Sequence, residues 1–251
     1  MKKVLVLLLL LCCAKGLSQN QSLTIFAASS LTESFTEIGR EFSKESGVAV
    51  RFQFAGSQIL RTQLENGAKA DVFASADTNT KLEKILEPPQ IFARNRLIVI
   101  TPKRGLARVK TLADLAQPNV KLVIAQATVP VGIYTRQMLK NLQATKRFGA
   151  NFESQVLKNV VSEESNVRQV ALKVRLGEAD AGVVYATDVT PELRANVIEI
   201  AIPERQNVVA SYPIAVLREA TNKNAARDFT AYVLGLAGQG ILHKWGFIKK
   251  P

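Results

Sequence analysis

Serine hydroxyls and the backbone N–H groups of predicted helix starts are the groups in this chain best suited to chemistry, and that chemistry is the binding of a small anion. A helix start exposes unpaired N–H groups and carries about half a positive charge. Several starts that converge on one point can hold a divalent oxyanion with neutral donors alone. Such an arrangement favours capture and release of an ion over a reaction on it. Five short segments carry these groups, four of them before a predicted helix: A-A-S-S-L at 27–31, F-A-G-S-Q at 54–58, V-P-V-G-I-Y at 129–134, S-N-V-R at 165–168 and A-G-V-V-Y at 181–185.

The serines and the tyrosine in these segments also have simpler interpretations. Ser30 begins S-L-T-E, the spacing of a capping box, and Ser57 also precedes an apolar helical pattern. Serines in such places usually cap the helix, so capping and anion binding both remain open for them. Tyr185 ends an apolar strand. It is either a core aromatic or a hydroxyl donor whose ring faces a cleft.

Residues for catalysis or metal binding are scarce. The single histidine, His243, lies near the C-terminus without partners for a triad or a metal site, and no S-x-x-K follows Ser29, Ser30 or Ser57. Both cysteines lie in the N-terminal leader, which excludes a cysteine nucleophile, a zinc cluster and a disulfide framework. The sequence therefore predicts that the protein is not an enzyme and holds no cofactor and no free metal ion.

Residues 1–18 are predicted to be a signal peptide. Lys2 and Lys3 precede an apolar run at 4–14, which is shorter than the about twenty residues that a membrane span needs. The protein is therefore expected to be exported to the periplasm or another extracytoplasmic space. The segment 10–13 is also a passable lipoprotein box, so a lipid anchor on Cys12 or Cys13 is an open alternative.

The length and charge of the remaining chain limit its fold and partners. Removal of the leader leaves about 233 residues, enough for two lobes. The formal net charge is +12 for the whole chain and +9 without the three leader lysines. Because the basic residues are dispersed and not interleaved with aromatics, nucleic acid is not an expected partner. A positive balance of this kind attracts small anions.

Hydrophobic periodicity alternates between strand and helix along the whole chain. This alternation indicates an α/β protein with mostly parallel sheets flanked by helices. In such sheets ligands bind beyond the carboxyl ends of strands, where the quoted segments lie. Strands are predicted at 23–27, 48–54, 71–75, 96–100, 121–125, 181–185, 197–202 and 212–217, and helices at 30–46, 57–66, 78–86, 132–142, 167–176, from about 224, and at 240–247.

Taken together with A-D-V-F-A-S-A-D at 70–77 and A-D-A-G-V-V-Y-A-T-D at 179–188, the five segments closely resemble the periplasmic molybdate-binding proteins of ABC transporters. This resemblance extends from residue 23 to about 247. It implies the type II periplasmic binding protein fold, an α/β architecture in which each of two lobes has a mixed or parallel sheet flanked by helices and the ligand cleft lies between the lobes. The chain would cross between lobes twice, with lobe 1 formed by 20–97 plus 208–251 and lobe 2 by 98–207.

The resemblance also assigns ligand contacts residue by residue. The family's two serines, its two backbone N–H donors and its tyrosine hydroxyl match Ser30, Ser57, Val131, Val167 and Tyr185. Two neighbouring positions depart from the family, namely Ser29 where alanine is common and Gly56 where serine is common. The implied ligand is molybdate, with tungstate as a second ligand, held through its oxygens.

The resemblance implies a monomeric solute-binding protein that delivers the oxyanion to the membrane permease of an ABC transporter. Two other functions remain open from the sequence. The protein could bind another oxyanion such as sulfate, or it could be an enzyme built on the same fold, because a fold alone does not determine function.

Overall fold

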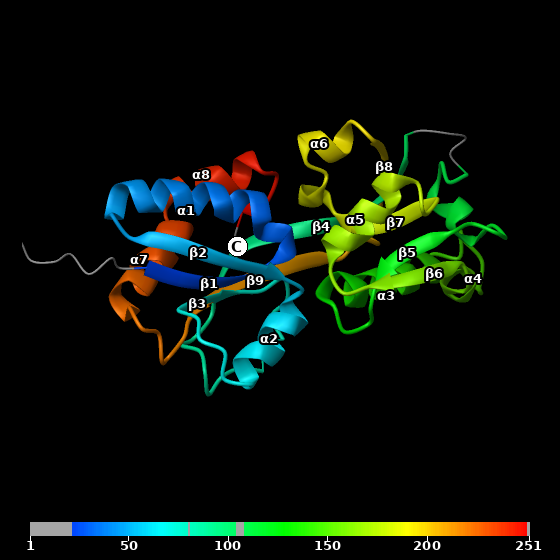
Figure 1. Cartoon of the computed structure of the whole chain (residues 1–251). Helices are drawn as coiled ribbons and strands as arrows, with labels where there is room; N and C mark the ends of the chain where they lie inside the picture. The colour runs from blue at the N-terminus through cyan, green and yellow to red at the C-terminus, as the bar shows by residue number, and fades with distance from the viewer. Residues whose placement is uncertain (1–21, 80, 104–107, 250–251) are drawn as a thin grey trace, which may run out of the picture.

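The structure, a computed structural model, describes residues 22–79, 81–103 and 108–249. Two lobes lie side by side, each with a sheet flanked by helices (Figure 1). The predicted signal peptide at 1–18 and the possible lipid attachment sites Cys12 and Cys13 lie outside the described residues.

The first lobe joins the two ends of the described chain, and the second is formed by its middle (Figure 1). The first lobe contains β1 Ser22–Ala28, η1 Ser29–Leu31, α1 Thr32–Ser46, β2 Ala49–Ala55, α2 Ser57–Glu65, β3 Val72–Ala74, β9 Val209–Val216, α7 Lys223–Leu234, α8 Leu236–Lys244 and β10 Ile248–Lys249. The second lobe contains η2 Leu112–Ala116, β5 Leu122–Ala125, α3 Pro130–Ala144, α4 Phe152–Lys158, β6 Val160–Glu164, α5 Val167–Leu176, β7 Ala181–Tyr185, η3 Ala186–Asp188, α6 Pro191–Arg194 and β8 Val197–Ala201.

One long strand, β4 Gln90–Pro102, belongs to both lobes. Its first part pairs with β9, and its second part pairs with β7 and β8. The strand order is β2-β1-β3-β9-β4-β7-β5-β6. The predicted lobe limit between residues 97 and 98 falls inside this continuous strand, so the lobe limits stay a prediction.

The sheet is mixed rather than mostly parallel. The strands β1, β2 and β3 run parallel to one another, and β5 runs parallel to β6 and β7. At the join, β9 pairs antiparallel with β3 and with β4, and β4 pairs antiparallel with β7. Because the parallel strands point their carboxyl ends toward the other lobe's helix starts, the segments that follow β1, β5 and β7 meet between the lobes.

Helix α1 illustrates how the sequence pattern produces the fold. Leu31, Phe35, Ile38 and Phe42 recur at helical spacing and are all buried. The helix ends at Gly47, whose left-handed φ of 74° is readily adopted by glycine. Its buried face packs against α7, and each fully buried phenylalanine contributes about 1.5–3 kcal/mol to stability.

Three local predictions differ from the structure. The helix predicted at 78–86 is wrong, because the described residues of this stretch form turns and the bridge of Leu86 to Leu217. Leu82 and Leu86 reach a small apolar cluster from these turns, so their spacing is satisfied without a helix. Helix α4 and strand β6 were not predicted, since α4 has only seven residues and β6 is half exposed.

Candidate functional site

The five predicted ligand residues lie together in one small pocket between the lobes. The space between its lining atoms, including the part open to solvent, is about 210 Å³. Ala28, Ser29, Ser30, Gly56, Ser57 and Ala76 line it from the first lobe, and Val129, Pro130, Val131, Val167 and Tyr185 line it from the second. The structure therefore brings together residues that are scattered along the chain.

Three helix starts supply the pocket with backbone donors. Helix α2 begins at Ser57, α3 at Pro130 and α5 at Val167. Proline lacks an N–H group, so Val131 carries the first donor of α3. In α5 the Asn166 side chain accepts the N–H groups of the two residues that follow Val167. The N–H of Val167 has no acceptor within its own helix and is free for a ligand.

A glycine brings the start of α3 close to the end of β5. A methyl group on Gly132 would lie 2.0 Å from the carbonyl oxygen of Gln126 and 2.5 Å from that of Ala125. No side chain fits there, so the turn of V-P-V-G requires glycine at this position. This close approach places the N–H of Val131 at the pocket.

Tyr185 supplies a hydroxyl that no protein group satisfies. Its side chain is 1% exposed, and its hydroxyl oxygen is buried without a hydrogen-bond partner among the described residues. Burial, reinforced by Tyr212, raises the pKa of Tyr185 well above its usual value, so the phenol remains a donor. An unsatisfied buried polar group costs about 1–3 kcal/mol, and an acceptor in the pocket would remove this cost.

The two predicted serines do not cap helices, so that interpretation is wrong. The N-cap residues of α1 and α2 are Leu31 and Gly56, neither of which makes a side-chain cap. The 3-10 turn η1 precedes α1 and shifts its start beyond the reach of Ser30. Instead, the Ser57 hydroxyl oxygen accepts the Ala76 N–H at 3.0 Å, which leaves its hydrogen available to the pocket.

The Ser30 hydroxyl is oriented by residues that the sequence analysis missed. The hydroxyls of Ser30 and Tyr212 are 3.0 Å apart. The Asn95 amide donates to Thr187 at 2.7 Å and to the Tyr212 oxygen at 3.4 Å. Asn95 and Tyr212 thus fix the position of the Ser30 hydroxyl in the wall of the pocket, and either hydroxyl of the Ser30–Tyr212 pair can be the donor. No local sequence signal identifies Tyr212 or Asn95, because each lies inside a strand without a motif around it.

The pocket offers hydrogen-bond donors but no charged side chain. All of its lining residues are neutral. Behind Tyr185, Asp188 is fully buried, and burial raises the pKa of its carboxyl to about 6 despite the nearby Arg168. The geometry suits an ion that only accepts hydrogen bonds and is released intact.

Comparisons with known proteins decide the family. Residues 23–248 match the family described as bacterial extracellular solute-binding protein. This chain belongs to that family. The solute-binding protein is 38% identical over 235 residues to a protein of Mycobacterium tuberculosis named molybdate-binding protein ModA, covering 91% of this chain and 85% of the relative.

Two solved structures of similar fold carry different ligands in their names. One is the Azotobacter vinelandii periplasmic molybdate-binding protein, with a TM-score of 0.78 and 20% identity, covering 91% of this chain and 100% of that one. Another is the sulfate-binding protein SubI of Mycobacterium tuberculosis, with a TM-score of 0.80 and 15% identity, covering 91% and 87%. At these identities the likeness shows the two-lobed type II fold of the solute-binding protein and not its ligand.

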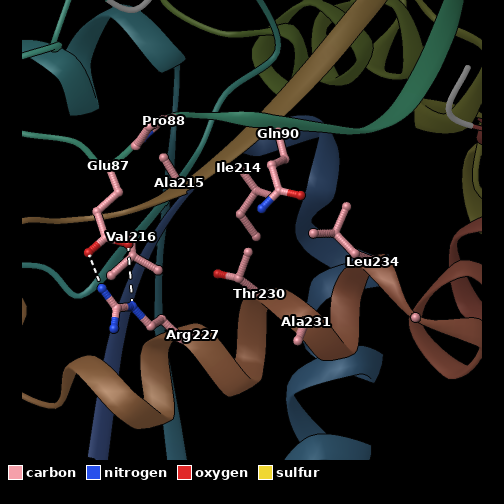
Figure 2. A pocket seen from close by; sticks show the side chains of 11 residues that line it. Glu87, Pro88, Gln90, Ile214, Ala215, Val216, Arg227, Thr230, Ala231 and Leu234 are labelled. Atoms are coloured by element: carbon pink, nitrogen blue, oxygen red, sulfur yellow. Dashed lines mark hydrogen bonds and ion pairs between the residues drawn. The ribbon is translucent and has the colours of Figure 1, made fainter.

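A larger depression on the first lobe has, among the described residues that line it, no unpaired hydroxyl like that of Tyr185 in the small pocket. Figure 2 shows its lining residues between α7 and strands β4 and β9. The space between them, including the part open to solvent, is about 950 Å³. Its charged side chains and its one lining hydroxyl are already engaged, since Arg227 pairs with Glu87 at 2.8 Å and the Thr230 hydroxyl donates to the Ala226 carbonyl. Size alone therefore does not identify the binding site of this solute-binding protein.

The described residues also bear on metals and membranes. Among residues 22–79, 81–103 and 108–249, no three histidine, cysteine or acidic side chains are grouped so that they could hold a metal ion. Within the same ranges no helix combines the length and the apolarity needed to cross a membrane.

Proposed function

We propose that this solute-binding protein captures molybdate, with tungstate as a second ligand, and delivers it to the permease of an ABC transporter. Ser30, Ser57 and Tyr185 contribute hydroxyl donors, and Val131 and Val167 contribute backbone N–H groups. The observation that carries the proposal is the buried Tyr185 hydroxyl, which lacks a partner in a pocket lined by helix starts. The names of the relatives support molybdate as the ion.

The donor-only pocket accounts for the choice among oxyanions. Molybdate, tungstate and sulfate are fully deprotonated near neutral pH and only accept hydrogen bonds. Monohydrogen phosphate would direct its own O–H group at donors, an unmatched buried group that costs about 1–3 kcal/mol. Sulfate is smaller, so its four oxygens cannot reach all of the hydrogen-bond donors in the pocket at once. Tungstate has nearly the size of molybdate and binds about as well.

Titration calorimetry with a matched set of oxyanions tests this assignment. We expect molybdate and tungstate to bind with similar dissociation constants, sulfate to bind much more weakly, and phosphate not to bind. Sulfate binding as tight as that of molybdate would overturn the choice of ligand in favour of a sulfate-binding protein. In the comparisons described above, a sulfate-binding role is supported only by the similarity of fold to SubI.

Binding is coupled to closure of the two lobes. Each lobe contributes about half of the pocket, so the ion gains its full set of donors only when the lobes meet. Hydrogen bonds also join the lobes directly. The Gln58 amide donates to the Ser165 carbonyl at 2.9 Å, and the Tyr134 hydroxyl donates to the Ala76 carbonyl at 3.3 Å. Small-angle scattering should show compaction on addition of molybdate, and unchanged profiles would contradict closure.

The protein acts as a binding protein and not as an enzyme. Its pocket has no charged group for proton transfer, and His243 lies in α8, away from the lining residues. Recovery of the oxyanion unchanged supports this role, whereas turnover of phosphate or carboxylate esters would contradict it. The family description supports an extracytoplasmic location. The functional unit is proposed to be a monomer, which light scattering in solution would check.

A further inference from the structure

Arg168 connects the two lobes at the edge of the small pocket. It is the second residue of α5 in the second lobe. Its Nε donates to the Ser29 carbonyl of the first lobe at 3.2 Å, and its Nη2 forms an ion pair with the Glu33 carboxylate of α1. A single guanidinium therefore holds both the start of α1 and the turn before it.

The same guanidinium also faces a buried carboxylate of its own lobe. Arg168 Nε lies 3.5 Å from Asp188 Oδ1, which has no hydrogen bond, while Asp188 Oδ2 accepts the Tyr185 N–H at 3.0 Å. A buried charge without a partner is costly, so this contact keeps Arg168 in place within the second lobe. Separation of the lobes would leave the Asp188 contact intact and break the contacts to Ser29 and Glu33.

The neighbours of these residues are the proposed anion donors. Arg168 directly follows Val167, and Ser29 directly precedes Ser30, so the contact joins two donor segments from opposite lobes. A planar guanidinium presents five donors in fixed directions, whereas an ammonium group presents three on a flexible stem. The hydrogen bonds that Gln58, Tyr134 and Asn95 make between the lobes are uncharged.

We propose that Arg168 is a positioning residue that clasps the lobes together over the bound anion and slows its release. The inference rests on the proposed function for the identity of the ion. The first lobe contributes Glu33 and the Ser29 carbonyl to this clasp, and the second lobe contributes Arg168 anchored on Asp188. The guanidinium does not touch the ion.

Variants of Glu33 test the clasp while both partners of the Arg168–Asp188 contact remain in the chain. Glu33→Ala removes the ion pair, and Glu33→Lys places a like charge beside Arg168. Glu37→Ala is the matched control, because Glu37 lies one turn later in α1 and binds Lys244 and Trp245 within the first lobe. The measurements are association and dissociation rates of molybdate, thermal unfolding, and small-angle scattering of the ligand-free proteins.

We expect Glu33→Ala to release molybdate about three- to tenfold faster, and Glu33→Lys more than about tenfold faster, with association changed less than about twofold. Glu37→Ala should match the wild type in both rates. Arg168→Lys should release molybdate as fast as Glu33→Ala, because lysine keeps the positive charge and loses the planar set of guanidinium donors. Dissociation rates of both Glu33 variants equal to that of Glu37→Ala would overturn the clasp.

Failure of the proposed function would be recognised separately. If the wild type binds no molybdate, the ion is misassigned, and scattering of the ligand-free proteins decides the clasp. A larger radius of gyration for Glu33→Lys than for wild type and Glu37→Ala supports it, whereas three identical profiles overturn it.

Discussion

The hydroxyl oxygens of Ser30 and Tyr212 lie 3.0 Å apart although 182 residues separate them along the chain. Asn95 donates to the Tyr212 oxygen, so Asn95, Tyr212 and Ser30 form a relay of hydrogen bonds that ends at the pocket. This relay fixes the position of the Ser30 hydroxyl beside an anion in the pocket. Cooperative chains of this kind also strengthen each hydrogen bond along them.

Replacement of Tyr212 by phenylalanine removes the relay and keeps the ring. We expect Tyr212→Phe to weaken molybdate binding about three- to tenfold and to lower the free energy of unfolding by about 0.5–1.5 kcal/mol, the net value of a typical hydrogen bond. Calorimetry and urea titration measure the two effects. Tyr232→Phe is the control, since the Tyr232 hydroxyl donates to exposed Glu45. Equal affinities of the two variants would contradict the relay.

Loss of the Ser57 hydroxyl should weaken molybdate binding by about 1.5–3 kcal/mol, the range for a hydrogen bond to a charged partner. Ser57→Ala also leaves the Ala76 N–H without its acceptor. Ser34→Ala is a matched control, because Ser34 is buried in α1 and bonds only the Leu31 carbonyl. If calorimetry gives the same affinity for Ser57→Ala and wild type, Ser57 does not belong to the site.

A methyl group on Gly56 should obstruct closure of the lobes. It would lie 2.5 Å from the Ser165 carbonyl of the second lobe, closer than real contacts allow. The φ of Gly56 is −61°, which alanine adopts without strain, so the free energy of unfolding should change little. We expect Gly56→Ala to weaken molybdate binding more than about tenfold.

Gly240→Ala provides the comparison for this glycine, because nothing lies within 4 Å of its added methyl group. Scattering with molybdate should show less compaction for Gly56→Ala than for Gly240→Ala and wild type. Full compaction and wild-type affinity of Gly56→Ala would mean that the lobes do not approach at this residue.

Asp188 should make stability depend on pH. Burial raises the pKa of its carboxyl from 3.8 to about 6 in the folded protein, so the folded state binds the proton more tightly than the unfolded chain. Its contribution to the free energy of unfolding therefore rises as the pH falls, by about 2 kcal/mol between pH 7 and pH 4. At higher pH the charged carboxylate depends on Arg168 for compensation.

The measurement compares wild type with Asp188→Asn by urea unfolding across this range. The difference in the free energy of unfolding between wild type and variant isolates Asp188. It is needed because other carboxyls, such as Glu37 and Glu87, have lowered pKa values and lose their stabilising effect as the pH falls. We expect the advantage of wild type over the variant to grow toward pH 4. A difference that stays constant with pH would rule out titration of Asp188 in this range.

Much of the fold and of the candidate site follows from local patterns. The bounds of α5 and β7 agree with the predicted segments at 167–176 and 181–185, because apolar spacing and a glycine stop act within a few residues. The resemblance of short motifs identified five residues that the structure brings into one pocket. Their role toward molybdate stays a prediction until binding is measured.

Local patterns failed where contacts between distant segments decide the outcome. The serines suited helix caps, yet their hydroxyls bond to Tyr212 and Ala76 instead. The stretch at 78–86 has helical spacing, yet it reaches its apolar cluster through turns. In each case a partner that no local pattern reveals competes with the local preference and wins.

The sequence by itself determined the alternation of strands and helices, the neutral donors at helix starts and the scarcity of catalytic groups. Only the tertiary structure decided that Tyr212 orients Ser30, that Arg168 joins the lobes and that Gly56 lies against Ser165. The physical reason is that periodicity and capping act between residues a few positions apart. Hydrogen bonds and ion pairs between distant segments exist only after β4 and β9 have brought the two lobes together.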